Sequence, residues 1–282
     1  MMFDTGTMNS VLASPHPSRQ LIRLLSYNIQ VGITTSRYRH YLTHSWKHVL
    51  PYPERMATLR GIAHFISDFD LVGLQEIDAG SLRTGFVDQA EYLAHTAPFP
   101  HWYSQTNRRL GHFARHALGL MGRFSAHRVV AHRLPGPIPG RGALEVHFGS
   151  QQEPLVVILV HLALGRRTRR MQFEYVARLA SQYRHVVVMG DLNCPPEAHE
   201  LLALTQTTDL RVADHGVATY PSWRPAQSFD HILTSPTLEV RRSQAFPVNY
   251  SDHLPVGLEL ILPAGLNLYH EQADVLPRIV EH

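Results

Sequence analysis

Several short apolar runs of strand length in this chain end or begin at a carboxylate, an amide or an imidazole. Asn28 closes the first run, Glu76 closes the second and His161 closes a third. The others are Asp191 and Asn193 after residues 186–190, Asp230 before residues 231–234, and Asp252 and His253 before residues 256–262. Each alone would be an ordinary polar residue at the end of a strand. Because strand ends of layered α/β folds converge on a crevice, the whole set indicates one site.

These side chains offer an oxygen-rich set of ligands without a thiolate. Carboxylates and amides suit a hard cation, and Mg²⁺ typically takes one or two carboxylates together with water and substrate phosphate. The sequence contains neither His-Glu-x-x-His nor paired cysteines, so the usual zinc spacings are missing. The residues therefore favour magnesium, and a zinc hydrolase built from histidine-rich segments is the weaker alternative.

The elements that must position these residues alternate between strands and helices. Leu59, Ile62 and Ile66 recur at helical spacing, as do Val176 and Leu179, and both segments read as amphipathic helices. Strands are expected at residues 23–29, 70–75, 117–121, 144–148, 155–160, 186–189, 231–234 and 256–262. Interspersed helices and strands of this kind predict an α/β layered fold.

Length and composition are those of a globular protein. The chain has 282 residues, 44% hydrophobic and 17% charged, which excludes disorder as its main state. Its longest apolar run, Leu155 to Val160, is too short to span a membrane. The first residues show no basic stretch followed by an apolar core, so we expect no secretory signal. With a single cysteine, Cys194, no internal disulfide can form. We expect a cytoplasmic protein, a flexible tail over residues 1–20, a domain over 21–265 and a C-terminal extension over 266–282.

The charge is only mildly basic. The formal net charge is +3, and Lys47 is the one lysine among 26 basic residues. Guanidinium groups favour bidentate contact with phosphate, although arginines on a solvated surface would give the same composition. Nucleases usually need a strongly basic surface, because neutralising backbone phosphates supplies most of their affinity. Nucleic acid and a lipid or small phosphodiester therefore both stay open as substrates.

Six motifs follow one another in a recognisable order. They are Ser-Tyr-Asn-Ile at 26–29, Leu-Gln-Glu-Ile-Asp at 74–78, Val-His-Leu at 160–162, Gly-Asp-Leu-Asn at 190–193, Phe-Asp-His-Ile-Leu at 229–233 and Ser-Asp-His-Leu-Pro-Val at 251–256. The ordered set resembles the endonuclease/exonuclease/phosphatase superfamily of deoxyribonuclease- and sphingomyelinase-like metal-dependent phosphoesterases. The resemblance implies a four-layer α/β/β/α sandwich, in which two mixed β-sheets pack face to face with helices outside.

The same resemblance implies a metal site and its ligands. Glu76 matches the principal ligand of Mg²⁺, with Asn28 beside it and Asp252 completing or supporting the site. Mn²⁺ is a possible substitute for magnesium. Whether these residues hold one ion or share two stays open.

Catalytic roles follow from the resemblance in the same way. Asp191 matches the group that orients and deprotonates the attacking water, and Asn193 and His161 match donors of hydrogen bonds to the phosphoryl oxygens. His253, oriented by Asp230, would stabilise the same negative charge. In-line displacement at phosphorus accumulates charge on these oxygens, which a metal and fixed donors stabilise.

One stretch departs from the family pattern. Leu118 stands where the family usually has asparagine, which puts one polar substrate contact in doubt and makes His116 and Arg115 the candidates to replace it. Arg123 and Arg141 match basic positions of the pattern, either as structural ties or as substrate contacts.

Two clusters of basic residues have weaker claims to a function. His40, His44 and His48 recur every fourth residue and would form either a wall of the site or a solvated helix face. The arginines within Arg166–Arg170 would either hold phosphate or form the polar first turns of a helix. His112 and His116 lack a third metal ligand nearby, so we expect no metal there.

The sequence therefore predicts a monomeric, Mg²⁺-dependent phosphoesterase that hydrolyses a phosphodiester. The alternative from a different class is a catalytically silent phosphate-binding module of the same fold.

Overall fold

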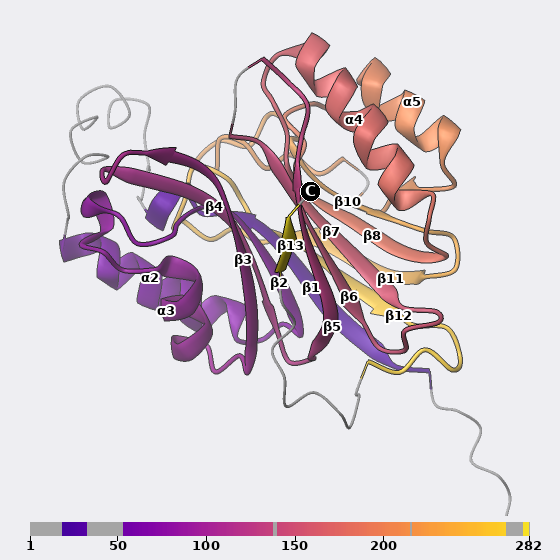
Figure 1. The fold of residues 1–282 in the computed structure, drawn as a ribbon, viewed down its shortest axis with the longest axis horizontal. Coiled ribbons are helices and arrows are strands. Elements are labelled where there is room, and N and C mark those ends of the chain that lie inside the picture. Colours follow the sequence, from indigo (N-terminus) through magenta and orange to yellow (C-terminus); the bar gives the residue numbers. More distant parts are fainter. Residues whose placement is uncertain (1–18, 33–52, 138–139, 215, 269–278, 282) are drawn as a thin grey trace, which may run out of the picture.

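Two mixed β-sheets packed face to face form the centre of the molecule, with helices on both outer faces (Figure 1). This computed structural model describes residues 19–32, 53–137, 140–214, 216–268 and 279–281. The predicted α/β/β/α sandwich is confirmed.

The first sheet has, among the described residues, six strands in the order β11-β12-β1-β2-β4-β3. Their bounds are β1 (Leu21–Asn28), β2 (Leu71–Asp78), β3 (His101–Leu110), β4 (Ala114–Gly122), β11 (Glu239–Ala245) and β12 (Val256–Ile261). Helices α2 (Pro53–Ile66) and α3 (Gln89–Thr96) cover its outer face, and short 3₁₀ turns lie at η1 (Gln30–Gly32) and η3 (Leu82–Thr84).

The second sheet has seven described strands in the order β13-β5-β6-β7-β8-β10-β9. Their bounds are β5 (Ala126–Arg133), β6 (Gly142–Phe148), β7 (Leu155–His161), β8 (His185–Asp191), β9 (Arg211–Val212), β10 (Asp230–Thr234) and β13 (Ile279–Glu281). Helices α4 (Arg166–Ala180) and α5 (His199–Thr207) cover its outer face.

Three apolar clusters hold the four layers together. The central cluster lies between the sheets and includes the fully buried Leu24 and Val157. A second cluster packs Ile62 of α2 against the first sheet, and a third packs Phe173 of α4 against the second. Each such side chain contributes roughly 1.5–3 kcal/mol when it leaves water. The predicted helical spacing is thus explained by burial against a sheet.

The strand directions bring the predicted polar residues to one edge of the sandwich. In the first sheet β1 and β2 are parallel and β12 is antiparallel to β1, so the ends of β1 and β2 lie where β12 begins. In the second sheet β7 and β8 are parallel, and β10 runs antiparallel to β8. His161, Asp191 and Asp230 are consequently aligned across three neighbouring strands.

Several sequence predictions concern the ends of the chain or lie outside the described residues. Residues 1–18 and the segment with His40, His44 and His48 are outside them. Within the predicted C-terminal extension, Leu266 and Leu268 are buried in the central cluster and β13 pairs with β5. The predicted domain boundaries stay predictions. In the part of the chain that the structure describes, no helix is long and apolar enough to cross a membrane.

Candidate active site

Asn28 connects the two sheets at the site. Its Nδ2 donates to Oδ2 of Asp191 at 3.1 Å and lies 3.3 Å from Oε1 of Glu76. The amide Oδ1 accepts from the backbone N–H of Gln30 at 3.2 Å. In this orientation the amide nitrogen faces the two carboxylates, so Asn28 offers its oxygen to a cation only after the amide rotates.

Glu76 reaches the site through an irregularity in β2. Leu74 pairs with Gly119 and Ile77 pairs with Ala117, so two residues of β2 lie opposite one residue of β4. This is the pattern of a β-bulge, which redirects a side chain at the edge of a sheet. Glu76 adopts φ +55°, a left-handed conformation that is costly for a residue with a Cβ. The bulge turns the carboxylate toward the site while β2 continues to Asp78.

Asp191 is held at the end of β8 by backbone and side-chain donors. Its Oδ1 accepts from the backbone N–H of Asn193 at 2.9 Å, and its Oδ2 accepts from Asn28. One amide N–H of Asn193 donates to the carbonyl of Leu162 at 2.9 Å, which leaves the other N–H for a ligand. The carboxylate of Asp191 is therefore fixed in position.

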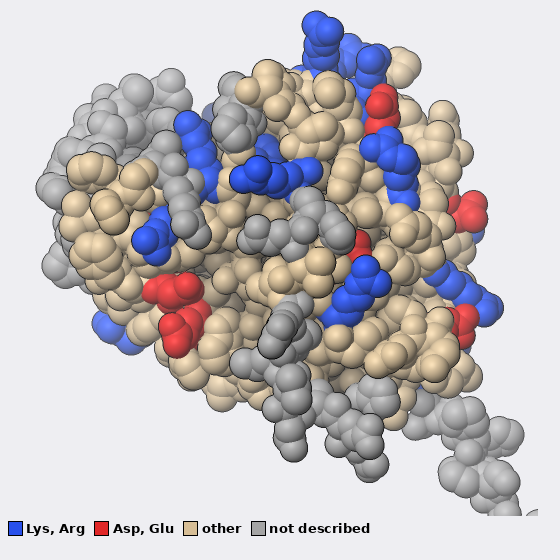
Figure 2. All heavy atoms as spheres, viewed as in Figure 1, with Lys and Arg blue, Asp and Glu red and all other residues tan. Residues whose placement is uncertain are grey.

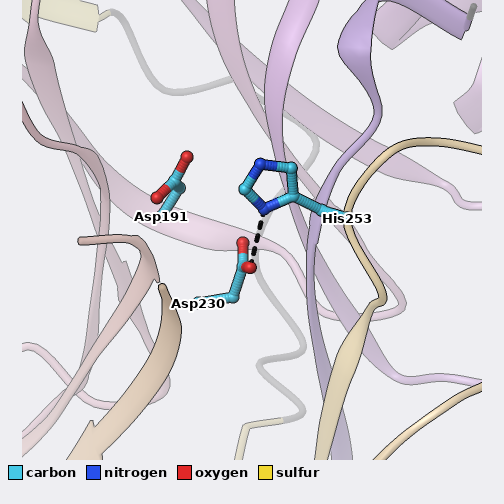
Figure 3. Close-up of side chains that lie close together, drawn as sticks. All are labelled: Asp191, Asp230 and His253. Carbon is cyan, nitrogen blue, oxygen red and sulfur yellow. Dashed lines mark hydrogen bonds and ion pairs between the residues drawn. The ribbon is translucent and has the colours of Figure 1, made fainter. Parts of the chain in front are cut away.

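His253 and Asp230 form a buried ion pair. Nδ1 of His253 lies 2.8 Å from Oδ2 of Asp230 (Figure 3). The hydroxyl of Thr219 donates to the same oxygen at 2.6 Å. Burial alone would lower the pKa of His253, but the charge and hydrogen bond of Asp230 outweigh it and raise this pKa to about 10. The imidazole is thus a cation at neutral pH, and Asp230 holds it in place.

His161 lies between two carboxylates. Its Nε2 is 3.5 Å from Oδ2 of Asp191 and 3.8 Å from Oε1 of Glu76. Burial, together with the nearby positive charges of Arg141 and His253, holds its pKa well below the usual value. His161 is therefore a neutral imidazole, which can donate one hydrogen bond into the site.

Carboxylates are crowded at this edge of the sandwich. Burial and the charges of Asp230 and Glu76 raise the pKa of Asp191 to about 7, although His253 opposes the shift. Burial and the charge of Glu76 likewise raise the pKa of Asp252 to about 6. Such shifts mark carboxylates that lack enough positive charge around them.

A divalent cation would supply the positive charge that these carboxylates lack. Glu76 and Asp252 lie close enough for the charge of Glu76 to raise the pKa of Asp252, and Asn28 contacts Glu76. Two carboxylates and an amide oxygen are ligands of the kind that magnesium takes. Asp191, Asp230 and His253 form a group whose ligand atoms lie within 4.8 Å of one another, but a protonated His253 has no lone pair for a metal.

A cavity of about 370 Å³ opens beside Glu76 and His161 and includes Arg141 and His116 in its walls. Leu118, at the position of the missing family asparagine, is instead buried in the central core. Arg115 is bound to the carbonyl of Ala79 at 3.4 Å. Of the two residues considered as replacements, His116 is the one that lines the cavity.

Two other arginines that the sequence singled out, Arg123 and Arg169, form structural contacts. Arg123 donates to the carbonyl of Ser67 at 2.7 Å and lies 3.4 Å from Asp70, so it is a structural tie. Arg169 forms a buried pair with Glu200 at 2.5 Å. His112 belongs to no group of potential metal ligands among the described residues.

Sequence reasoning missed two residues of the site. Thr219, which fixes Asp230, lies in a loop and carries no motif that would single it out. Arg108 lines the cavity from β3 and stood out only as one arginine among many. Each becomes identifiable only when the folded chain places it against a residue distant in sequence.

The fold and the site define a class of phosphoester hydrolases. The family model described as "Endonuclease/Exonuclease/phosphatase family" matches residues 25–253. The chain therefore belongs to the endonuclease/exonuclease/phosphatase family. None of the curated proteins matches it in sequence.

Solved structures with the same fold come from several bacteria. A family protein from Bacteroides thetaiotaomicron is 16% identical with a TM-score of 0.67, over 87% of this chain and 99% of that one. A family protein from Beutenbergia cavernae is 20% identical with a TM-score of 0.67, over 87% and 72%. A mannosyl-6-phosphatase from Bacteroides thetaiotaomicron is 16% identical with a TM-score of 0.64, over 86% and 100%.

Proposed function

We propose that this chain is a Mg²⁺-dependent phosphoesterase that hydrolyses a phosphodiester by in-line attack of water. The observation that carries the proposal is the convergence of Asn28, Glu76, Asp191, His161 and the Asp230–His253 pair from both sheets. Such a site combines a place for a cation, a fixed carboxylate and donors of hydrogen bonds. These are the parts that displacement at phosphorus requires.

Asp191 is the proposed base. Its two oxygens are oriented by Asn193 and Asn28, so the carboxylate can hold a water and accept its proton. The cationic His253 and the neutral His161 face the same space from opposite sheets. Together with the second N–H of the Asn193 amide, they would stabilise charge on the phosphoryl oxygens.

Glu76, Asp252 and a rotated Asn28 would hold the magnesium ion, with Mn²⁺ as a substitute. When bound, the ion supplies Lewis-acid stabilisation of the negative charge that develops on the phosphoryl group.

The substrate, the compartment and the assembly are also part of this proposal. We propose a cytoplasmic monomer that acts on a nucleic acid, a lipid or another small phosphodiester. One of the similar folds is that of a phosphatase, whose name indicates a monoester substrate, so monoesters belong in any test. The competing function is a silent phosphate-binding module, which predicts binding without turnover.

The test is hydrolysis by the full-length protein of bis(p-nitrophenyl) phosphate, p-nitrophenyl phosphate, plasmid DNA and phospholipid vesicles. We expect turnover with Mg²⁺ or Mn²⁺ and none with EDTA. Asp191→Asn should lower the rate roughly 1,000-fold, because it removes the base. The exposed Asp209→Asn is the matched control and should keep the wild-type rate.

Circular dichroism of both variants shows whether a lost rate reflects unfolding. A folded Asp191→Asn variant that keeps most of its rate contradicts the role of Asp191. Mg²⁺ binding by wild-type protein without turnover of any substrate class supports the silent module instead.

A further inference from the structure

The cavity beside Glu76 and His161 is also lined by residues to which the proposed catalysis gives no role. Arg108 comes from the end of β3, Arg141 from the residue before β6, and Thr168 from the first turn of α4. The cavity therefore combines Glu76 and His161 with two arginines, of which Arg141 lies close enough to His161 for their charges to interact.

Two glycines allow the arginines to approach each other. Gly140 has φ +116°, and a Cβ on it would lie 2.9 Å from Cβ of Arg108. A Cβ on Gly142 would overlap Oδ1 of Asn107. The Gly-Arg-Gly segment thus packs directly on β3, which places the guanidinium of Arg141 near that of Arg108.

The guanidinium groups of Arg108 and Arg141 have no direct partner in the part of the chain that the structure describes. No side-chain hydrogen bond or ion pair engages either of them there, although both residues bond through their backbones. Burial lowers the pKa of Arg141, and the charge of Arg108 lowers it further, against the opposing effect of Asp191 and Glu76. Two neighbouring cations of this kind are stabilised by an anion, and guanidinium binds phosphate or carboxylate in a bidentate manner.

We propose that this cavity binds a second anionic group, a phosphate or a carboxylate, of a small phosphate ester whose scissile phosphate lies at Glu76 and His161. The inference rests on the proposed function, since it names the substrate class of that site. Arg108 and Arg141 are then the residues that determine specificity.

The cavity suits a small molecule better than a polymer. Its volume of about 370 Å³ is within the range of small-molecule sites. Its described walls contain no Phe, Tyr or Trp ring on which the bases of a single strand would stack. On the face shown in Figure 2 the basic side chains form separate groups divided by uncharged surface, rather than one continuous stripe.

Binding of three related esters tests the proposal. Glycerol 3-phosphate has one anionic group, 3-phosphoglycerate adds a carboxylate, and 2,3-bisphosphoglycerate adds a second phosphate as well. Affinities are measured by calorimetry with Mg²⁺ in the Asp191→Asn background, so that no turnover is needed. We expect one or both multiply charged ligands to bind about tenfold more tightly than glycerol 3-phosphate.

Two arginine variants and a control show which residues cause the difference in affinity among the three esters. Adding Arg108→Gln or Arg141→Gln should bring the three affinities to within about twofold of one another. Arg211→Gln, at an exposed position on β9 of the second sheet, should keep the difference in affinity among the three esters. Which of the two larger ligands gains more identifies the second anion as carboxylate or phosphate.

Equal affinities in the parent protein, including the absence of binding, would overturn the proposal, and so would a difference that survives both arginine variants. Tighter binding of a single-stranded oligonucleotide that depends on Arg108 would overturn it in favour of nucleic acid. None of these results depends on hydrolysis, so a failure of the proposed function is recognised separately.

Discussion

Individual residues of the site are set by what surrounds them as much as by their own chemistry. The side chain of Asp230 accepts a hydrogen bond from Thr219 at 2.6 Å and lies 2.8 Å from Nδ1 of His253. Its negative charge keeps the imidazole protonated and pointed into the site. The pair therefore acts as one cationic unit.

Asp230→Asn is expected to lower kcat by about 10- to 100-fold, because the imidazole loses both its orientation and its proton. Thr219→Val removes the other hydrogen bond to Asp230, together with the longer one that the hydroxyl accepts from the backbone N–H of Phe229, and should have a smaller effect. Steady-state kinetics of the two folded variants checks the order. An equal loss of kcat in both variants would show that the hydroxyl of Thr219 is as important as the charge of Asp230, and would contradict this order.

Glu145 is a second buried carboxylate, on β6 and apart from the site. His132 at 2.9 Å, His147 at 2.6 Å and Tyr183 at 2.8 Å all contact its oxygens. Burial would raise the pKa of Glu145, but these hydrogen bonds prevail and hold it well below the usual 4.5. A lowered pKa in the folded state contributes stability above the unfolded-state value, which is lost as the pH falls below about 4.5.

Glu145→Gln should therefore destabilise the protein at pH 7 by about 3 kcal/mol, since one imidazole loses its acceptor. Wild-type stability should fall between pH 5 and pH 3, to an extent that the variant does not share. Urea unfolding at a series of pH values measures both curves. Parallel curves for the two proteins would mean that Glu145 does not cause the acid sensitivity.

Residues of the site were predictable where a strand end and a motif coincided. Asn28, Asp191 and His161 end strands, and Glu76 lies at the bulge two residues before the end of β2. The structure brings Asn28 and His161 within hydrogen-bonding or ion-pair range of both Glu76 and Asp191. Arg108 was not predictable, because its neighbour Arg141 comes from another sheet. A spacing in the sequence carries no information about such a contact.

At the scale of elements, strands with a continuous apolar run were predicted and the others were missed. Each of the eight predicted segments overlaps a strand, although three of them (23–29, 70–75 and 256–262) extend one residue beyond it. The missed strands among the described residues are β3, β5, β9, β11 and β13. Of these, β11 is largely exposed and carries Arg, Ser and Gln, so it shows neither an apolar run nor a clear alternation. Helices α3 and α5 are short, and their apolar faces are too narrow to give a strong helical period.

The close approach of β7 and β8 fixes the position of Asp191. Gly190 has φ +147°, and a Cβ there would overlap the carbonyl oxygen of Val160. Gly190→Ala should cost about 3 kcal/mol or more, because a backbone atom cannot move aside. Thermal unfolding and the hydrolysis rate should both fall.

Gly73→Ala is the matched control within the core. Its Cβ would lie 2.6 Å from the ends of Leu159 and Met189, which are flexible side chains that can adjust. We expect a cost of about 1 kcal/mol and a preserved rate. A smaller cost for Gly190→Ala than for Gly73→Ala would contradict the steric argument.

For the whole molecule, the outer edge of the second sheet is covered by β13. Its residues pair in parallel with Val129, Val130 and Ala131 of β5. Ending the chain at residue 278 should uncover this edge and promote association between copies, since an unpaired apolar strand is a template for pairing.

Size-exclusion chromatography with light scattering measures that association. Val280→Thr is the control, because it keeps the strand and changes only a side chain that is already exposed. The truncated protein should form larger species with rising concentration, whereas the control should elute like wild type. Identical elution of all three would mean that β13 does not protect the edge.

The conformation of Glu76 has a consequence for protein engineering. Its left-handed backbone costs about 1 kcal/mol that glycine would not incur, and its carboxylate adds to the repulsion on Asp191 and Asp252. Glu76→Gly would relieve both, so a library sorted only by melting temperature would enrich this variant, which we expect to be inactive from the proposed role of Glu76 as a magnesium ligand. Directed evolution toward heat resistance must therefore select for turnover at every round.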